Sequence, residues 1–245
     1  MPERYSDYDD FAWFYNRHWG HDFHRRVLGV LDRLLFPRLA AGSRVLDLCC
    51  GDGHFTQALV ERGFRVTGID ASERMLGHAR ENAPGCKYIL ADAREFHLAP
   101  EFSAAVSVFD SLNHMMSIED LGRVFRNVRA ALREGGWFVF DLNQEAAYTD
   151  FSAGPFTIVE DDNVCISTGS YDRASRLVRC DLVMFRFQGG WRRTDLTLFQ
   201  RCYDEREVAA ALTAEDFTRV DLYSSEDLGL TTDDVSARVF FLAQA

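Results

Sequence analysis

The sequence predicts an α/β protein whose core is a doubly wound, mostly parallel sheet of seven strands. Short apolar runs alternate with amphipathic helical patterns as far as Asn143, and a glycine turn connects the first run to the helix after it. Beyond Asn143 the pattern changes to hairpins, with strand-like alternation between turn residues. Because strands joined by helices run parallel with right-handed crossovers, we expect one such sheet with an antiparallel β-hairpin insertion after its fifth strand.

Seven segments are typical of buried strands, and helical segments lie before and between them. The strands are expected at 44–48, 65–69, 87–90, 102–109, 137–142, 217–223 and 238–242. The helices are expected within 5–19 and over 23–39, 54–62, 72–82, 118–132 and 205–212. Pro37 interrupts the second helix, and Ser72 is suited to cap the helix that follows it. The first helix is rich in aromatic residues, so it serves either as core cover or as a lid over a ligand.

The hairpin segments divide the chain into three parts. Strands are expected at 156–159, 164–171, 177–187 and 194–201, with turns at 161–163 and 189–190. We therefore expect a helical cover at 1–40, a ligand-binding core at 41–145 and 204–245, and an antiparallel insertion at 146–203. The insertion has two open roles, a lid over the site or a contact between the subunits of a homodimer.

Composition and charge limit the classes of partner. The chain has 245 residues and a formal net charge of -11, which argues against nucleic acid as a partner because phosphate-binding surfaces need clustered Lys and Arg. No apolar run approaches a membrane span, and the acidic start MPERYSDYDD is unlike a signal peptide, so we expect a cytoplasmic protein with no membrane partner. The six cysteines show no CxxC spacing and are expected as reduced thiols. His18, His21 and His24 share helical spacing without a clear further ligand, so no metal is expected.

The segment RVLDLCCGDGHF, from Arg44 to Phe55, indicates a nucleoside site. Gly51 and Gly53 let the backbone turn sharply and approach a ligand, and the helix that starts near His54 offers free N–H groups. The second strand leads into Asp70, whose carboxylate can accept both hydroxyl groups of a ribose. Such a site lies at the carboxyl ends of parallel strands.

Four motifs in order along the chain, LDLCCGDG, GIDAS, ADA and FDSLNH, resemble those of class I S-adenosylmethionine-dependent methyltransferases, which have a Rossmann-like fold. The resemblance covers nearly the whole chain. It is nearest to the small-molecule group that includes glycine N-methyltransferase-like enzymes and aminosugar N,N-dimethyltransferases. The aromatic first helix and the segments FSAAVSVFDSLNHM, GGWFVFDLN and TLFQRCY carry this closer similarity.

The resemblance implies S-adenosyl-L-methionine as cofactor and assigns its contacts. Residues matching Asp47, Gly51 and Gly53 surround the methionine part of the cofactor, and the match to Asp70 binds the ribose. Cys49 belongs to the same loop and stands where most relatives have Gly or Ala. Because Cys is small and tolerates burial, we expect cofactor binding to survive this difference.

The resemblance also places the adenine ring and the reactive sulfur. Asp92 corresponds to the acceptor for the adenine amino group, and the N–H of Ala93 lies on the ring. Ala71 and Met75 are expected to enclose that ring, and Phe109 is expected to border the sulfonium.

Candidate residues for methyl transfer come from three segments of the chain. Tyr15, His114 and Tyr203 are the catalytic candidates, and Asn113, His114 and Arg201 are the candidates for binding the methyl acceptor. His114 stands where relatives often carry an aromatic residue, so the shape of the acceptor pocket stays open.

The preferred hypothesis is a methyltransferase that acts on a small-molecule amine. Two alternatives stay open: O-methylation of a small hydroxylated metabolite, and a non-catalytic S-adenosylmethionine-binding protein. A nicotinamide-dependent dehydrogenase is disfavoured, because the segment GDGHFT lacks the third glycine of GxGxxG and Asp92 would have no task there.

Overall fold

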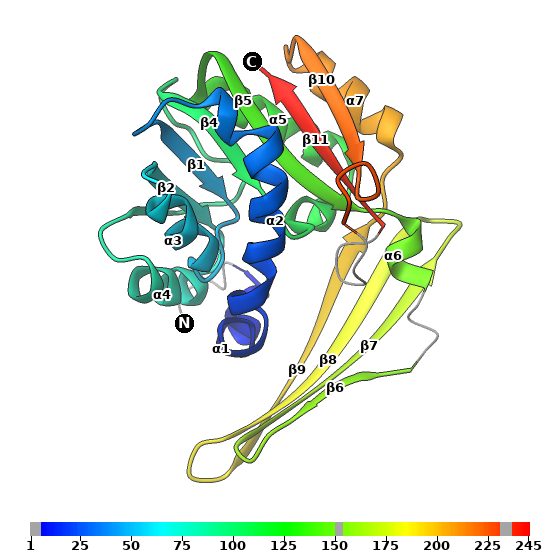
Figure 1. The fold of residues 1–245 in the computed structure, drawn as a ribbon. Helices are drawn as coiled ribbons and strands as arrows, with labels where there is room; N and C mark the ends of the chain where they lie inside the picture. The colour runs from blue at the N-terminus through cyan, green and yellow to red at the C-terminus, as the bar shows by residue number, and fades with distance from the viewer. Residues whose placement is uncertain (1–5, 150–153, 231–236) are drawn as a thin grey trace.

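The computed structural model describes residues 6–149, 154–230 and 237–245, and within them it contains a seven-stranded sheet and a four-stranded sheet (Figure 1). The strands of the larger sheet are β1 (Arg44–Leu48), β2 (Arg65–Asp70), β3 (Lys87–Leu90), β4 (Phe102–Ser107), β5 (Leu132–Asn143), β10 (Arg219–Ser224) and β11 (Arg238–Gln244). Their order is β10-β11-β5-β4-β1-β2-β3, and β11 runs antiparallel to both of its neighbours while the pairs from β5 to β3 are parallel. The predicted seven-stranded, mostly parallel sheet is confirmed.

Helices cover both faces of this sheet. On one face, α2 (Gly20–Leu34) and α3 (His54–Glu61) bury Leu31 and Leu59 against Val45 of β1. On the other face, α5 (Ile118–Ala131) and α7 (Glu205–Ala214) bury apolar side chains against β4, β5 and β11. α4 (Glu73–Asn82) packs beside α3 and β3, and a short 3-10 turn, η1 (Phe36–Arg38), contains Pro37. Because each face needs its own apolar helix stripe, the sheet is doubly wound.

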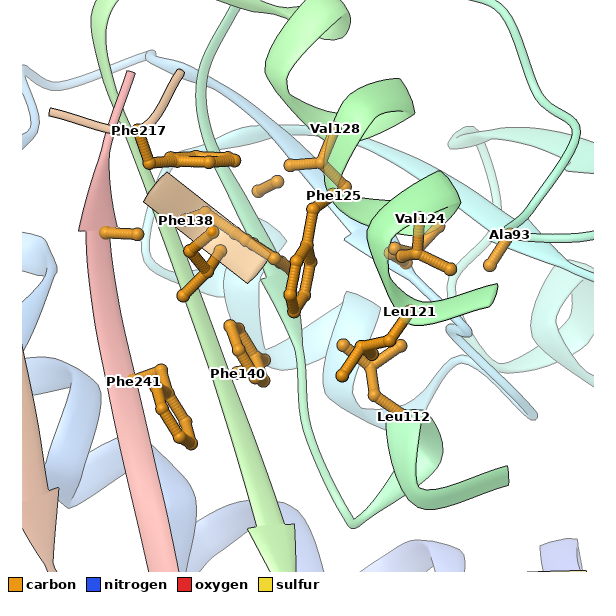
Figure 2. Packing of buried hydrophobic residues seen from close by; sticks show 14 of the residues in the cluster. Ala93, Leu112, Leu121, Val124, Phe125, Val128, Phe138, Phe140, Phe217 and Phe241 are labelled. Atoms are coloured by element: carbon orange, nitrogen blue, oxygen red, sulfur yellow. The ribbon is translucent and has the colours of Figure 1, made fainter. Parts of the chain in front are cut away.

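Phenylalanine rings fill the core between α5 and the strands β5 and β11 (Figure 2). The rings of Phe140 and Phe241 stack with centroids 4.8 Å apart and an interplanar angle of 3°. Phe125 and Phe138 lie against Phe140, and none of the four is exposed. Each buried ring contributes roughly 1.5 to 3 kcal/mol of transfer free energy. This packing fixes β5 to β11, which matters below because the two strands carry buried charges.

The second sheet is the predicted hairpin insertion. Its strands β6 (Phe156–Val159), β7 (Asn163–Asp172), β8 (Leu177–Phe187) and β9 (Trp191–Arg201) pair antiparallel in chain order. It extends from the main sheet as an arm (Figure 1). The aromatic helix α1 (Tyr8–His18) packs Phe11 and Phe14 against Leu182 of this arm, and Arg17 pairs with Glu160 at 2.6 Å. The predicted start of this helix at Tyr5 lies outside the described residues.

The predicted bounds of the strands differ most from the structure where the backbone leaves the regular β conformation. The expected strand 102–109 ends at Ser107, because Phe109 and Asp110 adopt φ values of 65° and 51°. β5 begins at Leu132, before the expected 137, and includes Gly135 and Gly136 with a register shift against β4. Two short elements were not foreseen: η2 (Ser111–His114) and α6 (Glu145–Thr149). Over the described part of the chain, no helix has both the length and the apolar character needed to cross a membrane.

The substitution Gly53→Ala tests how closely the start of α3 must approach α4. A Cβ at Gly53 would lie 2.7 Å from Cα of Ala79, whereas a Cβ at Gly63 would meet nothing within 4 Å, and both glycines have a φ of 83°. Both Gly→Ala variants lose about 1 to 2 kcal/mol from the left-handed conformation. We expect Gly53→Ala to lose roughly a further 1 to 3 kcal/mol from overpacking, measured by urea unfolding. Equal losses in the two variants would contradict this close approach.

Candidate cofactor and acceptor site

The loop after β1 has an unusual backbone. Cys49, Gly51 and Gly53 have φ values of 59°, 54° and 83°, and α3 begins at the next residue, His54. A left-handed conformation at a residue with a side chain costs about 1 to 2 kcal/mol, so the position of Cys49 is locally strained. A Cβ on Gly51 would lie 3.8 Å from Cε1 of Tyr15, in the space between this loop and α1. A bare backbone here leaves room for a ligand beneath the helix.

The Asp70 carboxylate joins this loop to the end of β2. Its Oδ2 accepts a hydrogen bond from the Gly51 N–H at 2.8 Å, and its Oδ1 accepts one from the Ser72 N–H at 2.9 Å. Burial raises the pKa of Asp70 to about 6, while the backbone N–H groups oppose that rise. Ser72 then caps α4 by accepting from the Met75 N–H at 3.1 Å. At neutral pH the carboxylate is an ionised acceptor at the edge of the crevice.

Asp92, after β3, is held by Arg94. The two nitrogens Nε and Nη2 of Arg94 donate to the two Asp92 oxygens at 2.9 and 2.6 Å. This pairing holds the pKa of Asp92 below its usual range. Arg94 also approaches Asp120 of α5 at 3.4 Å, so it contacts two carboxylates. Oδ1 of Asp92 also accepts from the Arg94 N–H at 2.8 Å, so the carboxylate is fixed at the end of β3.

A cavity of about 380 Å³ lies between these strand ends and α1. It is within the usual size of a small-molecule site, about 300 to 1,000 Å³. Ten of the residues expected at the site line it: Tyr15, Cys49, Gly51, Asp70, Ala71, Met75, Asp92, Ala93, Phe109 and His114. The strand order β4-β1-β2-β3 brings nine of them together, because the carboxyl ends of neighbouring parallel strands share one edge, and Tyr15 reaches the cavity from α1.

Asp47 and Gly53 lie behind the cavity lining. Oδ2 of Asp47 accepts from the Thr56 hydroxyl at 2.5 Å, and burial raises the pKa of Asp47 to about 7. Gly53 faces the backbone of α4 at Ala79. Both positions therefore shape the loop from its inner side.

Asn113, Arg201 and Tyr203 also lie outside the lining of this cavity. Asn113 accepts from the Asn143 N–H at 3.0 Å and donates to the Arg201 carbonyl at 2.9 Å, so it joins η2 to β5 and β9. The Arg201 guanidinium lies over the ring of Tyr203, 5.7 Å from its centroid. The buried Tyr203 hydroxyl donates to the carbonyl of Met115. These three side chains hold the segment that carries His114.

The contacts of His114 define its tautomer. Nδ1 lies 2.8 Å from the carbonyl oxygen of Phe199, which can only accept, so Nδ1 carries the proton. Nε2 then has a lone pair, which accepts from the Tyr8 hydroxyl at 2.9 Å and lies 3.1 Å from Nε2 of Gln200. Burial lowers the pKa of His114, although the charge of Asp110 opposes this. The ring is therefore a neutral base at neutral pH.

Sequence reasoning missed Tyr8, Asp110 and Gln200, which surround His114. Tyr8 lies seven residues before Tyr15, so both fall on the same face of α1, and that spacing was the available signal. α1 is fixed over the cavity because Asp9 accepts from the Ser72 hydroxyl at 2.6 Å. The His18 ring contacts Asn163 at 2.9 Å, while the side chains of His21 and His24 lie outside the described residues.

The fold and the site define an enzyme class whose members bind an adenosyl cofactor at the carboxyl ends of parallel strands. A family model described as a methyltransferase domain matches residues 45–136. The putative methyltransferase YqeM of Bacillus subtilis strain 168 is 30% identical over 207 residues, 82% of this chain and 83% of that protein. The chain belongs to the class I S-adenosylmethionine-dependent methyltransferases.

Two further comparisons concern enzymes that methylate sugar nitrogen. The dTDP-3-amino-3,4,6-trideoxy-alpha-D-glucopyranose N,N-dimethyltransferase of Streptomyces venezuelae is 31% identical over 122 residues, 50% of this chain and 51% of that protein. The sugar N-methyltransferase KedS8 from Streptoalloteichus sp ATCC 53650 superposes with a TM-score of 0.77 at 20% identity, covering 96% of this chain and 92% of that chain. The structural similarity shows the shared fold.

The residues present suit S-adenosylmethionine. The bare backbone at Gly51, the ionised Asp70 and the apolar side chains of Met75 and Phe109 offer, in one cavity, the close approach, acceptor and apolar cover that an adenosyl group needs. When bound, the cofactor supplies a methyl group activated by a sulfonium. The protein has to bind it, orient the acceptor and exclude water.

The buried carboxyl group of Asp47 is expected to make the folded state less stable as pH rises. Its side chain is 1% exposed, and its pKa rises from 3.8 to about 7 on folding. The folded state therefore binds a proton more tightly than the unfolded state, and stability falls as pH rises from about 4 to about 7. Asp47→Asn mimics the protonated form and keeps an acceptor for Thr56. We expect it to raise the free energy of unfolding at pH 8 by up to about 4 kcal/mol.

Chemical denaturation of both proteins at pH 4.5 and pH 8 measures this effect. The gain should shrink toward zero at pH 4.5, because the wild-type carboxyl is then protonated as well. The control is Asp32→Asn, whose carboxylate is 55% exposed and lies 3.6 Å from Arg62, and which should change stability only slightly. A loss of stability in Asp47→Asn at pH 8 would contradict the cost assigned to the buried charge.

Proposed function

We propose that the protein transfers a methyl group from S-adenosylmethionine to the nitrogen of a small-molecule amine. The observation that carries this proposal is the neutral His114 ring, whose unprotonated Nε2 lies where the cavity meets the insertion. An amine reaches the site mainly as an ammonium ion, which must lose a proton before its lone pair can attack. His114 can take that proton through the Tyr8 hydroxyl, which gives its own proton to Nε2 and receives the proton of the ammonium ion.

The strength of this base favours nitrogen over oxygen. An alkylammonium has a pKa of about 10.4 and an unassisted hydroxyl about 15.7, compared with about 6.5 for ordinary histidine. Moving a proton to such a base costs roughly 5 kcal/mol from the ammonium and roughly 13 kcal/mol from the hydroxyl. The burial that lowers the pKa of His114 increases both costs. A base this weak is suited to an amine.

The other site residues have assigned roles in this proposal. Asp70 and Asp92 accept from the ribose and the adenine amino group, Ala71, Ala93 and Met75 border the ring, and Phe109 borders the sulfonium. The loop at the methionine part is formed by Asp47, Cys49, Gly51 and Gly53.

The residues around the acceptor either position His114 or exclude water. The positioning residues for His114 are Asn113, Arg201 and Tyr203, and Tyr15 on α1 excludes water. Helix α1 and the strands of the insertion act together as a lid. The N-methylating relatives support this assignment by similarity.

Paired acceptors test the atom that is methylated. The purified protein is incubated with S-adenosylmethionine and with amines and alcohols of matched carbon skeleton, such as cyclohexylamine and cyclohexanol, and the products are identified by mass spectrometry. We expect methylated amines and no methylated alcohols. Methyl transfer to hydroxyl groups alone, or tight cofactor binding without any product, would overturn the proposal.

The variant His114→Asn tests the base in the same assay. We expect its kcat for an amine to fall by about 10²-fold or more at pH 7. The deficit should shrink as pH rises toward 10, because the amine then arrives unprotonated. His97→Asn, at an exposed loop position, is the matched control. A deficit that does not change with pH would show that His114 only positions the acceptor.

A further inference from the structure

A second cavity of about 280 Å³ lies against the cofactor cavity. Three residues border both: Tyr8, His114 and Leu198. The second cavity extends beneath α1 and the inner face of the insertion, where Phe11, Trp19 and Leu182 form an apolar wall. Its polar wall is made of Asp110, Asn143, Tyr148, Gln200 and Arg238.

Tyr8 and His114 form the boundary between the two cavities. Their rings meet edge to face with centroids 5.3 Å apart, and the Tyr8 hydroxyl donates to Nε2 of His114. A molecule in the second cavity can therefore direct a nitrogen toward this boundary while its body stays outside the cofactor cavity. The His114 base then lies between the body of the acceptor and the source of the methyl group.

The polar wall carries an excess of negative charge. Arg238 contacts Oδ1 of Asp110 at 2.7 Å and donates to Oδ2 of the fully buried Asp141. Gln200 donates to Oδ2 of Asp110 at 2.7 Å, and the Tyr148 hydroxyl donates to Gln200 at 3.0 Å. Two carboxylates thus face one guanidinium, and Asp110 is the one that borders the cavity. A positively charged ligand is therefore favoured beside Asp110.

The arginines of both cavities are already paired with carboxylates. Among the described residues that line them, these are Arg94, which contacts Asp92 and Asp120, and Arg238, which contacts Asp110 and Asp141. A phosphoryl group would have to displace one of these carboxylates and would lie near its negative charge. The Arg238 side chain is 5% exposed, so displacing one of its carboxylates would leave a buried charge uncompensated.

We propose that the second cavity binds the methyl acceptor and selects a compact, cation-forming amine without a phosphoryl group, with Asp110 and Gln200 as its polar contacts. This inference rests on the proposed function and narrows its substrate class. The apolar wall holds the carbon skeleton, and Asp110 attracts the ammonium ion before His114 removes its proton. We expect a nucleotide-linked amine not to bind in this cavity. The cavity is smaller than the cofactor cavity, and its acidic wall would repel the phosphoryl groups.

Calorimetry tests the binding preference without requiring turnover. The protein saturated with S-adenosylhomocysteine is titrated with a set of primary and secondary amines that includes cyclohexylamine and free aminohexoses, and separately with thymidine diphosphate. We expect at least one amine to bind and thymidine diphosphate not to bind. Asp110→Asn should weaken the amine at least tenfold. Failure of every amine to bind, binding of thymidine diphosphate, or an unchanged amine affinity in Asp110→Asn would each overturn the proposal.

A second variant locates the amine without changing any charge. The side chain of Ala147 borders the second cavity, so Ala147→Phe should fill it and abolish amine binding while the affinity for S-adenosylhomocysteine stays within about twofold. Val159→Phe, at a position 74% exposed on β6, adds the same ring outside both cavities and should change neither affinity. Amine binding that survives Ala147→Phe would contradict the location.

Turnover separates this inference from the function on which it rests. N-methylation of a nucleotide-linked aminosugar, with free amines left unmodified, would overturn the acceptor class and leave N-methyl transfer intact. Methylation of hydroxyl groups alone would instead overturn the proposed function.

Discussion

The site depends on the contact between the Asp70 carboxylate and the Gly51 N–H, 2.8 Å apart. It fixes the left-handed loop after β1 to the end of β2, and through Ser72 it also fixes the start of α4. Because β1 and β2 are adjacent and parallel, the two chain segments leave the sheet at the same edge. The bare loop, the carboxylate and the helix start therefore form one unit. The cavity for an adenosyl group follows from that unit.

Helix α1 covers the cavity, and contacts with both α4 and the insertion hold it there. α1 is joined to α4 through Asp9 and Ser72, and to the insertion through its aromatic face and the Arg17–Glu160 pair. Moving α1 away from the cavity would therefore break aromatic packing as well as polar contacts. Buried acidic groups beneath it, Asp47 among them, have raised pKa values and weaken the folded state at neutral pH. Such costs are typical of sites arranged for binding rather than for stability.

Local patterns predicted the architecture because each of its elements has its own signal. The apolar run before the glycine turn predicted β1 with its observed bounds, and the Ser72 cap predicted the start of α4. The end of β4 was missed because the positive φ values of Phe109 and Asp110 arise from tertiary contacts, including the Asp110 N–H bond to Asp141. Ten expected residues share one cavity because strand ends converge. Tyr203 and Asn113 could not be placed, because their partners Met115 and Arg201 are brought to them only by folding.

A crystal structure of the complex with S-adenosylhomocysteine would show whether these strand ends form the cofactor site. We expect electron density in the larger cavity, with the ribose hydroxyls on Asp70, the adenine between Met75 and the segment of Asp92 and Ala93, and the sulfur beside Phe109. The smaller cavity behind Tyr8 and His114 should stay free of the cofactor. Density for the adenosyl group in that smaller cavity, or an Asp70 carboxylate turned away from the ribose, would rule out this cofactor site.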